Sequence, residues 1–432
     1  MRSLSIALDH TEVAAPTPLQ KLIRLAGRYT LSALGPVSIS AAHFLGAVLI
    51  LHTLSRQHFG LFSFVMTIVP FCISAASALI GAPTTIGIRN RGHVDDAELA
   101  TFQKANLVLA VFACAVVFVS LLASGLRLEA ALLFGLYGAL MSLRWLGRVY
   151  AYATNAPARA TISDIAYSIL VAAGLATLHF LDRMTMTYIA ALFSFAALAS
   201  MVVFDGGYLR KQLRPLAAGK LCAYAPVWRD LTRWSLLGVA ATELTVNAHA
   251  YFVTFFSGPG AFALLALGSL LMRPVSLILS AFPEMERPVM ARAIGAKDLP
   301  RAFRAVKEFR TAGIAVLLVT VLLAAVLLFW FPQIVLKQGY DAHQAMLIVV
   351  LWIAIMAIRV LRTPEAVFLQ AAGAFQLLAN ASLKSCAVSL AATLALLLAF
   401  GPIASLLGIV AGDVVLTASI FGLVRGWRLQ HG

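Results

Sequence analysis

Charge is scarce in this sequence, and negative charge most of all. Asp and Glu number only 18 against 33 Lys and Arg, and charged residues of both signs make up 12% of the 432 positions. Soluble domains carry about a quarter charged residues, whereas 61% of this chain is hydrophobic. The composition excludes an ordinary soluble domain and indicates an all-α polytopic membrane protein.

Cysteines and catalytic motifs are also few or missing. The four cysteines (Cys72, Cys114, Cys222 and Cys386) fall in apolar runs or a basic loop, with no spacing typical of a disulfide framework or a metal site. The sequence contains no GxSxG, HExxH, P-loop or GxGxxG motif in a strand-to-helix setting. No signal peptide is recognisable in the first 28 residues. We therefore expect neither an enzyme nor a cofactor or metal.

What is present is a series of long apolar runs. A membrane-spanning helix needs about 20 such residues at a rise of about 1.5 Å each. Residues 1–28 are polar, and their end is amphipathic, so we expect an interfacial helix on the cytoplasmic membrane surface. Twelve spans are predicted after it, at about 29–53, 60–80, 105–124, 130–147, 160–180, 185–204, 234–257, 262–282, 313–331, 344–361, 377–400 and 403–423.

The net charge of +15 follows membrane topology rather than nucleic-acid binding. With twelve spans, nearly all Lys and Arg fall in the termini and loops of one side. By the positive-inside rule that side is the cytoplasm, which places both termini there. The opposite loops are short and hold only Arg56, Arg127, Arg183 and Lys337, while Arg273 and Lys384 fall within spans.

The chain divides into two six-span halves, 29–207 and 234–432, joined by a basic cytoplasmic linker at 208–233. HTLSRQHFGLFSF after span 1 corresponds to FFSGPGAFALLAL after span 7, and MSLRWLGR at 141–148 corresponds to MAIRVLRT at 356–363. Six spans per half give both halves the same orientation. This arrangement is typical of transporters built from parallel repeats.

Polar residues inside the spans are the candidates for a site, because ionisable groups at membrane depth are costly and usually face a cavity or a bundle interior. On span 7, Glu243, Asn247 and Tyr251 form one stripe at i, i+4 and i+8, and His249 lies on the neighbouring stripe with two threonines. These groups serve either as hydrogen bonds between helices or in function, and the functional reading is favoured for Glu243.

Other spans carry further polar residues. Arg273 stands directly before Pro274, which interrupts the helical hydrogen-bond ladder beside a permanent positive charge. It either pairs with Glu243 or receives an anion. Lys384 and Asp413 are expected to form an ion pair, His43 is a lone histidine able to titrate near neutrality, and Arg144 with Arg148 is expected to snorkel to the cytoplasmic surface.

Several segments resemble a known family. Within HTLSRQHFGLFSF, Phe59, Gly60 and the following Leu-Phe-Ser resemble the L-G-P-E-x-Y-G-L-F-S signature of the Wzx-like polysaccharide-export flippases of the MOP superfamily. NAHAYFVTFFSGPGAF is similar to the family's N-x-D … G-P-x-x-x-G-x-Y, and AGAFQLLANASLK … GPIASLLGIVAG resembles its last two spans. His249 stands where the family has an aspartate, which removes the usual acidic group from that position.

The resemblance implies a twelve-helix flippase that moves undecaprenyl-pyrophosphate-linked oligosaccharides across the bacterial inner membrane by alternating access. Its partners would be this lipid-linked substrate, membrane lipids and a polysaccharide polymerase or export machinery. The candidate substrate-binding residues are Arg273 for the phosphate, then Lys384, with Asn247, Tyr251 and His43. The candidate ion-coupling residues are Glu243, His249 and Asp413.

Two alternatives remain open. A MATE-like, ion-coupled exporter of small molecules has the same fold, but for organic cations it requires a net acidic cavity, whereas the charges inside these spans are mixed. A membrane-embedded glycan-assembly enzyme requires a sizeable outer loop or paired loop carboxylates, whereas the outer loops are short and nearly free of acids.

Overall fold

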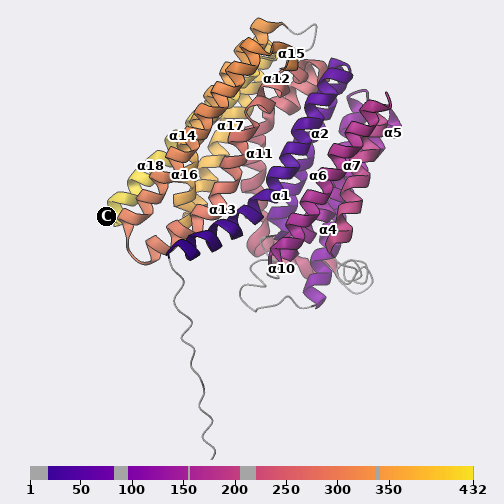
Figure 1. The fold of residues 1–432 in the computed structure, drawn as a ribbon. Coiled ribbons are helices and arrows are strands. Elements are labelled where there is room, and N and C mark those ends of the chain that lie inside the picture. The colour runs from indigo at the N-terminus through magenta and orange to yellow at the C-terminus, as the bar shows by residue number, and fades with distance from the viewer. Residues whose placement is uncertain (1–17, 82–95, 154–155, 205–219, 336–340, 432) are drawn as a thin grey trace, which may run out of the picture.

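The computed structural model describes residues 18–81, 96–153, 156–204, 220–335 and 341–431, all as helices and short connections (Figure 1). The N-terminal half contains six long helices and two short ones: α1 (Pro18–Thr53), α2 (Arg56–Ala76), η1 (Ser77–Gly81), α4 (Asp96–Ala123), α5 (Leu128–Ala153), α6 (Pro157–Phe180), α7 (Met186–Ser200) and η2 (Met201–Phe204).

The described part of the predicted linker forms three short helices, η3 (Leu221–Tyr224), α10 (Ala225–Val227) and η4 (Trp228–Thr232), which precede the C-terminal half. The long helices follow: α11 (Arg233–Phe256), α12 (Pro259–Leu271), α13 (Arg273–Gly295), α14 (Leu299–Trp330), the short α15 (Pro332–Val335), α16 (Ala342–Ala371), α17 (Phe375–Phe400) and α18 (Ser405–His431). The first part of the predicted linker, 208–219, and the side chains of the predicted interfacial helix lie outside the described residues.

Ten described helices are long and apolar enough to cross a membrane, and α12 with the first part of α13 makes an eleventh candidate that is bent by 60°. The all-helical polytopic fold is thus confirmed, while the count of twelve spans remains a prediction. α11 is not among these candidates although it has 24 residues. Its polar residues Glu243, Asn247 and His249 lower its mean hydropathy.

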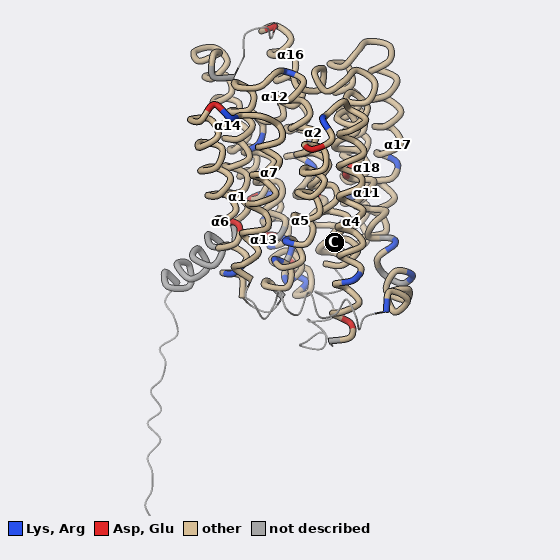
Figure 2. The backbone as a smooth tube through the Cα atoms, turned by 90° about the vertical axis from the view of Figure 1, so that its right-hand side faces the viewer, with Lys and Arg blue, Asp and Glu red and all other residues tan. Residues whose placement is uncertain are grey.

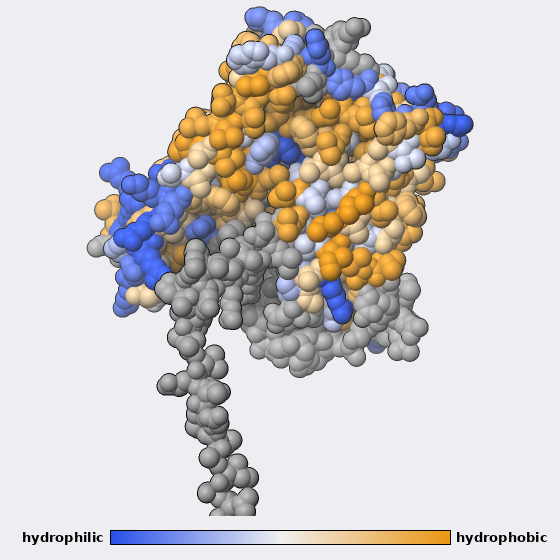
Figure 3. Space-filling view, viewed as in Figure 1, coloured by the Kyte–Doolittle hydropathy of each residue, from blue (hydrophilic) through white to orange (hydrophobic). Residues whose placement is uncertain are grey.

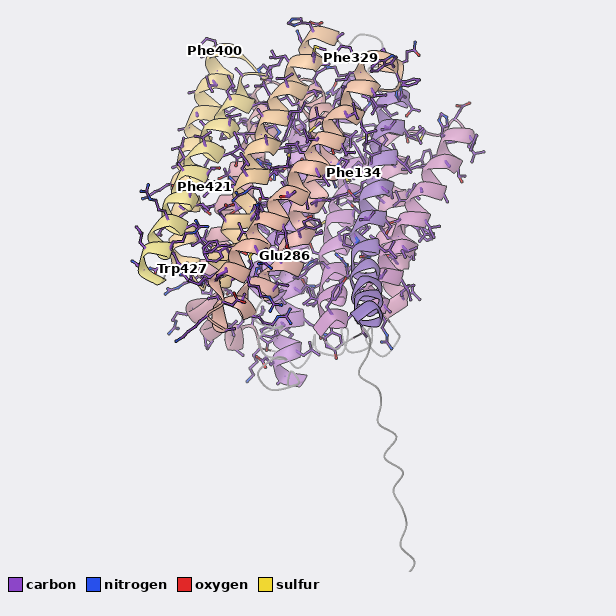
Figure 4. All side chains as sticks on the ribbon, turned by 60° about the vertical axis from the view of Figure 1, so that its left-hand side comes forward. Phe134, Glu286, Phe329, Phe400, Phe421 and Trp427 are labelled. Atoms are coloured by element: carbon purple, nitrogen blue, oxygen red, sulfur yellow. The ribbon has the colours of Figure 1, made fainter. Side chains whose placement is uncertain are left out.

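Successive spans run in opposite directions along the bundle, with α12 and the first part of α13 counted as one bent span. One end holds the close of α13 and the start of α14, and we call it the basic end because Lys and Arg gather there (Figure 2). The opposite end holds the turn at Gly258 and is called the far end. A band of apolar surface lies between hydrophilic patches in Figure 3. Exposed aromatic side chains, Phe329 and Phe400, mark the far end (Figure 4), as is typical where a membrane protein meets the interface.

The two halves are built on the same packing scheme. In the N-terminal half α1 packs on α6, α5 on α7 and α4 on α5. In the C-terminal half α11 packs on α17, α16 on α18 and α14 on α16. These pairs correspond when the chain is read as two repeats of six spans, so the structure supports the repeat that the sequence motifs suggest.

The halves meet along α2 and α12, and the contact is closest at the far end. A methyl group on Gly60 would overlap the backbone carbonyl of Pro259, so only glycine permits this approach. Arg56 Nε donates to the carbonyl oxygen of Gly260 at 2.8 Å. Gly258 supplies the positive φ of +84° that turns the chain from α11 into α12. The far end is therefore closed between the halves.

Candidate functional site

Arg273 lies at a break between two helices near the middle of the bundle. α12 ends at Leu271, α13 begins at Arg273, and the two helices are bent by 60°. Pro274 follows at the second position of α13 and has no N–H to donate. The guanidinium and the positive N-terminal end of α13 therefore lie together at mid-bundle, an arrangement that favours an anion. This confirms the predicted kink beside the charge.

The partner of Arg273 is a hydroxyl from the other half. Its Nε donates to Ser40 Oγ of α1 at 3.1 Å. The predicted pair with Glu243 is wrong, because Glu243 of α11 instead accepts from Ser74 of α2 at 2.8 Å and from Asn247 at 3.0 Å. A serine occupies one donor of a guanidinium that has five. Arg273 thus has donor capacity left for a ligand.

Two cavities meet at Arg273 and His43, which line both. The far chamber, of about 70 Å³, is lined among others by Phe59, Ser63 and Ser269. The basic-side chamber, of about 210 Å³, is lined by Ser40, Trp145 and Leu277, with two further arginines, Arg144 and Arg148. α1 and α2 line both chambers with neighbouring segments, and Arg273 of α13 lies where the chambers meet. The two chambers therefore follow one another along the interface between the halves.

Arg144 and Arg148 hold the basic-side chamber positive. They bind Asp164 of α6 at 2.6 and 3.0 Å, and Arg144 and Asp164 are almost fully buried. The prediction that both arginines snorkel to the surface is therefore wrong, because Asp164 compensates their desolvation inside the bundle. Together with Arg273, the chamber wall carries three guanidiniums against one carboxylate, a formal charge of +2.

His43 connects the chambers to a buried hydroxyl pair. Its Nε2 lies 2.8 Å from Tyr167 Oη, and Tyr167 Oη lies 3.1 Å from Tyr137 Oη. The imidazole also stacks on Phe193, with ring centroids 5.8 Å apart. Sequence reasoning identified His43 but neither tyrosine, since nothing in the sequence distinguishes these tyrosines from other aromatic core residues.

The polar stripe on α11 faces three different environments. Glu243 and Asn247 reach the contact with α2. Tyr251 packs between Phe64 and Phe71, and its buried hydroxyl has no partner among the described residues. The threonines bond carbonyls of their own helix four residues back rather than a neighbouring helix. Among the polar side chains of α11 discussed above, Glu243 forms a hydrogen bond with another helix within the described residues.

His249 lies away from both chambers. Its ring packs between Phe262 and Trp352, with centroids 5.9 and 5.4 Å away. The imidazole is buried, and its Nδ1 has no hydrogen-bond partner among the described residues. This position suits an aromatic-packed core histidine, so its contacts give the proposed coupling role no support.

The predicted ion pair between Lys384 and Asp413 is also wrong. Asp413 accepts from Arg359 at 2.8 Å and from Arg362 at 2.6 Å, while Lys384 is exposed on the outside of α17. Lys384 therefore lines neither chamber. Each half thus contains one buried carboxylate between two arginines near corresponding segments, MSLRWLGR and MAIRVLRT. The matching arginines were visible in the sequence, but their acidic partners come from helices that only the fold brings together.

No metal site accompanies these groups in the part of the chain that is described: no cluster of three or more His, Cys, Asp or Glu side chains there could hold a metal ion. Asp164 and Asp413 each bind two arginines instead. What the arrangement offers chemically is a hydroxyl-lined, net positive passage between two pseudo-equivalent bundles.

Comparisons with known structures identify the fold. The chain superposes on the lipid II flippase MurJ in an inward closed conformation with a TM-score of 0.67 at 11% identity, over 91% of this chain and 87% of that one. It matches a MOP superfamily transporter from Pyrococcus furiosus with a TM-score of 0.63 at 13% identity, over 95% of both chains. An inward-facing multidrug resistance MATE transporter gives 0.61 at 15% identity, over 93% and 94%.

The chain therefore has the fold seen in the MOP superfamily transporters. No protein-family model matches the sequence, and no curated protein sequence matches it significantly. At these low identities the likeness defines the fold and leaves the substrate to be argued from the site.

Proposed function

We propose that the protein is a flippase that moves an undecaprenyl-pyrophosphate-linked oligosaccharide across the bacterial inner membrane for polysaccharide biosynthesis. The observation that carries this proposal is the position of Arg273, at a helix N-terminus between two chambers and close to a second basic cluster. A pyrophosphate diester carries two negative charges, which match the formal +2 of the chamber wall. Guanidinium forks bind phosphate oxygens in pairs, so the headgroup can be held during transfer.

The remaining features fit the same substrate. Serine and threonine side chains beside the charges, such as Ser63, Thr67 and Ser269, supply hydroxyls for sugars. The prenyl chain stays in lipid, so no apolar cavity of its size is needed. With the far end closed by α2 and α12, movement of one half against the other would open the passage on alternate sides.

The proposal includes the orientation in the membrane. Twelve spans, with α11 as the least apolar, place both termini and the basic end in the cytoplasm by the positive-inside rule. The linkage to a lipid-anchored glycan also implies a neighbouring polymerase or export machinery that receives the flipped units.

The MATE-like exporter of small molecules remains the second candidate because MATE transporters share the fold. For organic cations it would need an acid free to meet the substrate. Asp164 and Asp413 are neutralised by arginines, and the carboxylate of Glu243 is bonded to Ser74 and Asn247. These contacts favour an anionic substrate.

The test in cells is replacement of Arg273 in a strain that depends on this protein for its polysaccharide. Arg273→Ala should abolish export with the protein still present in the membrane. Arg273→Lys should restore part of the export, because the charge remains but the bidentate fork is lost. Exposed Lys384→Ala is the matched control and should export normally. Normal export by Arg273→Ala at normal abundance would rule out the phosphate-binding role.

A further inference from the structure

His43 is the one titratable imidazole that lines both chambers. Its Nε2 is bonded to Tyr167 at 2.8 Å, and within the described residues no protein group bonds Nδ1. The Tyr167 hydroxyl can accept from an imidazolium while donating onward to Tyr137, 3.1 Å away, so the network accommodates either protonation state. Neither His249 nor Glu243 lines these cavities.

The charged and titratable groups around His43 come from three helices. α13 contributes Arg273, α5 contributes Arg144, Arg148 and Tyr137, and α6 contributes Asp164 and Tyr167. α2 contributes only neutral cavity-lining groups such as Ser63 and Thr67, and α7 contributes the Phe193 ring. The sum of the formal charges is +2, so an empty passage opposes a further positive charge on His43.

This balance changes when a dianion arrives. A pyrophosphate bound at Arg273 neutralises the local excess and lies beside the imidazole, whose ordinary pKa near 6.5 is close to neutrality. Resting on the proposed function, we infer that His43 binds a proton that is taken up together with the anionic headgroup and reduces the net charge of the headgroup during transfer. The proton adds to the imidazole, and Tyr167 then accepts its Nε2–H.

Binding of the proton at His43 and binding of the anionic headgroup are then linked. Because the proton is bound only with the anion, binding is strongest at low pH and weakens as pH rises through the titration of His43 in the complex. Removal of the headgroup on the other side of the membrane frees the proton there. Transport of one pyrophosphate lipid would therefore be accompanied by transport of about one proton in the same direction.

The experiment is titration calorimetry on the purified full-length protein in detergent. The probe is a water-soluble short-chain prenyl pyrophosphoryl sugar, a diester with no group that titrates near neutrality. The measured heat in buffers of different ionisation enthalpy gives the number of protons taken up per molecule bound. We expect about one proton for the wild type near neutral pH. His43→Gln should bind the probe more weakly than the wild type at low pH, with almost no proton uptake and an affinity that no longer changes with pH.

Two further variants distinguish linkage from structural damage. His179→Gln changes an exposed histidine at the end of α6 and should leave the uptake as in the wild type. Tyr167→Phe keeps the ring but removes the hydroxyl that accepts from the imidazolium, and should reduce the uptake. Its affinity for the probe should change less with pH than that of the wild type.

The outcomes separate the two proposals. Binding by the wild type with no proton uptake, or equal uptake by His43→Gln, would overturn the role of His43 and leave the flippase assignment intact. No binding by the wild type, or unimpaired binding by Arg273→Ala, would overturn the anion site and with it this inference.

Discussion

Two buried carboxylates in this protein each compensate the charge of two arginines. Asp164 is buried between Arg144 and Arg148, and Asp413 between Arg359 and Arg362. In each cluster one carboxylate compensates the desolvation of two guanidiniums, which leaves a positive charge in each half. The cluster in the N-terminal half lines the basic-side chamber, so its excess charge is available to a substrate.

Replacement of the shared carboxylate should destabilise the bundle. Asp164→Asn keeps the shape of the side chain but leaves two arginines without a counter-charge, one of them almost fully buried. Removing one partner of a buried ion pair costs about 3–5 kcal/mol. We expect a clearly lower melting temperature in detergent. Asp182→Asn, at an exposed position with positive φ that asparagine tolerates, is the control and should melt like the wild type. Equal melting of Asp164→Asn would contradict the account.

A second prediction concerns pH and the basic end. Burial, with a smaller contribution from Glu308, raises the pKa of Glu286 above its ordinary value of 4.5. Glu286 follows the membrane-spanning part of α13 and lies toward the basic end (Figure 4). When folding raises the pKa of a carboxyl, the folded state loses stability as the pH rises from the pKa in the unfolded state to the pKa in the folded state. Glu286→Gln should therefore raise the melting temperature at about pH 8.

The same substitution should have little effect at about pH 4, where the carboxyl is protonated in both states. Glu129→Gln changes an exposed acid at the start of α5 and is the control for loss of a surface carboxylate. A Glu286→Gln variant that melts like the wild type at both pH values would show that the fold does not strain this carboxyl.

The residue level is also where sequence reasoning reached its limit. Arg273, His43 and Glu243 were identified because ionisable residues in apolar runs are rare. Their partners were not, since pairing depends on which helices become neighbours. Asp164 was overlooked because it lies near the start of its span, where an acidic residue is common. Lys384 was given too much weight because the position of a residue along a span does not reveal which face of the helix points inward.

At the level of elements, two features give the passage its form. The break between α12 and α13 places a helix N-terminus and Arg273 at mid-bundle. The close contact of α2 with α12 shuts the far end. The sequence predicted the first through Pro274. The tight helix contact at Gly60 was read only as part of a family motif.

A larger residue at Gly60 should act as a wedge. Its side chain would overlap the Pro259 carbonyl, so Gly60→Val should part α2 from α12 and open the far end. The readout is labelling of Ser63→Cys, in the far chamber, by a membrane-impermeant maleimide in a variant without the native cysteines. We expect labelling several-fold faster than with Gly60 present, together with slower transport. Gly422→Ala, where a methyl group meets open space, is the control. Unchanged labelling would show that this contact is not the closure.

At the level of the whole molecule, the helices of the N-terminal and C-terminal parts of the chain meet at a net positive passage. Periodicity and hydropathy predicted the all-helical membrane class, because these depend on local composition and on the bilayer. The division into two halves of six spans stays a prediction. Periodicity and hydropathy did not predict that each half would contain an arginine–carboxylate–arginine cluster. That property arises only when helices distant in sequence pack side by side.

The most direct measurement is flipping by the purified protein in liposomes. A fluorescent undecaprenyl-pyrophosphoryl sugar is placed in both leaflets, and a reducing agent that cannot cross the bilayer quenches the outer leaflet. Wild-type protein should make nearly all of the label accessible to the reducing agent. Arg273→Ala should leave about half of the label protected, as in empty liposomes. For a neutral lipid of the same length and sugar, about half of the label should stay protected with either protein. Equal flipping of the charged and the neutral lipid, or full flipping by Arg273→Ala, would contradict the proposal that this passage transports a pyrophosphate-linked glycan.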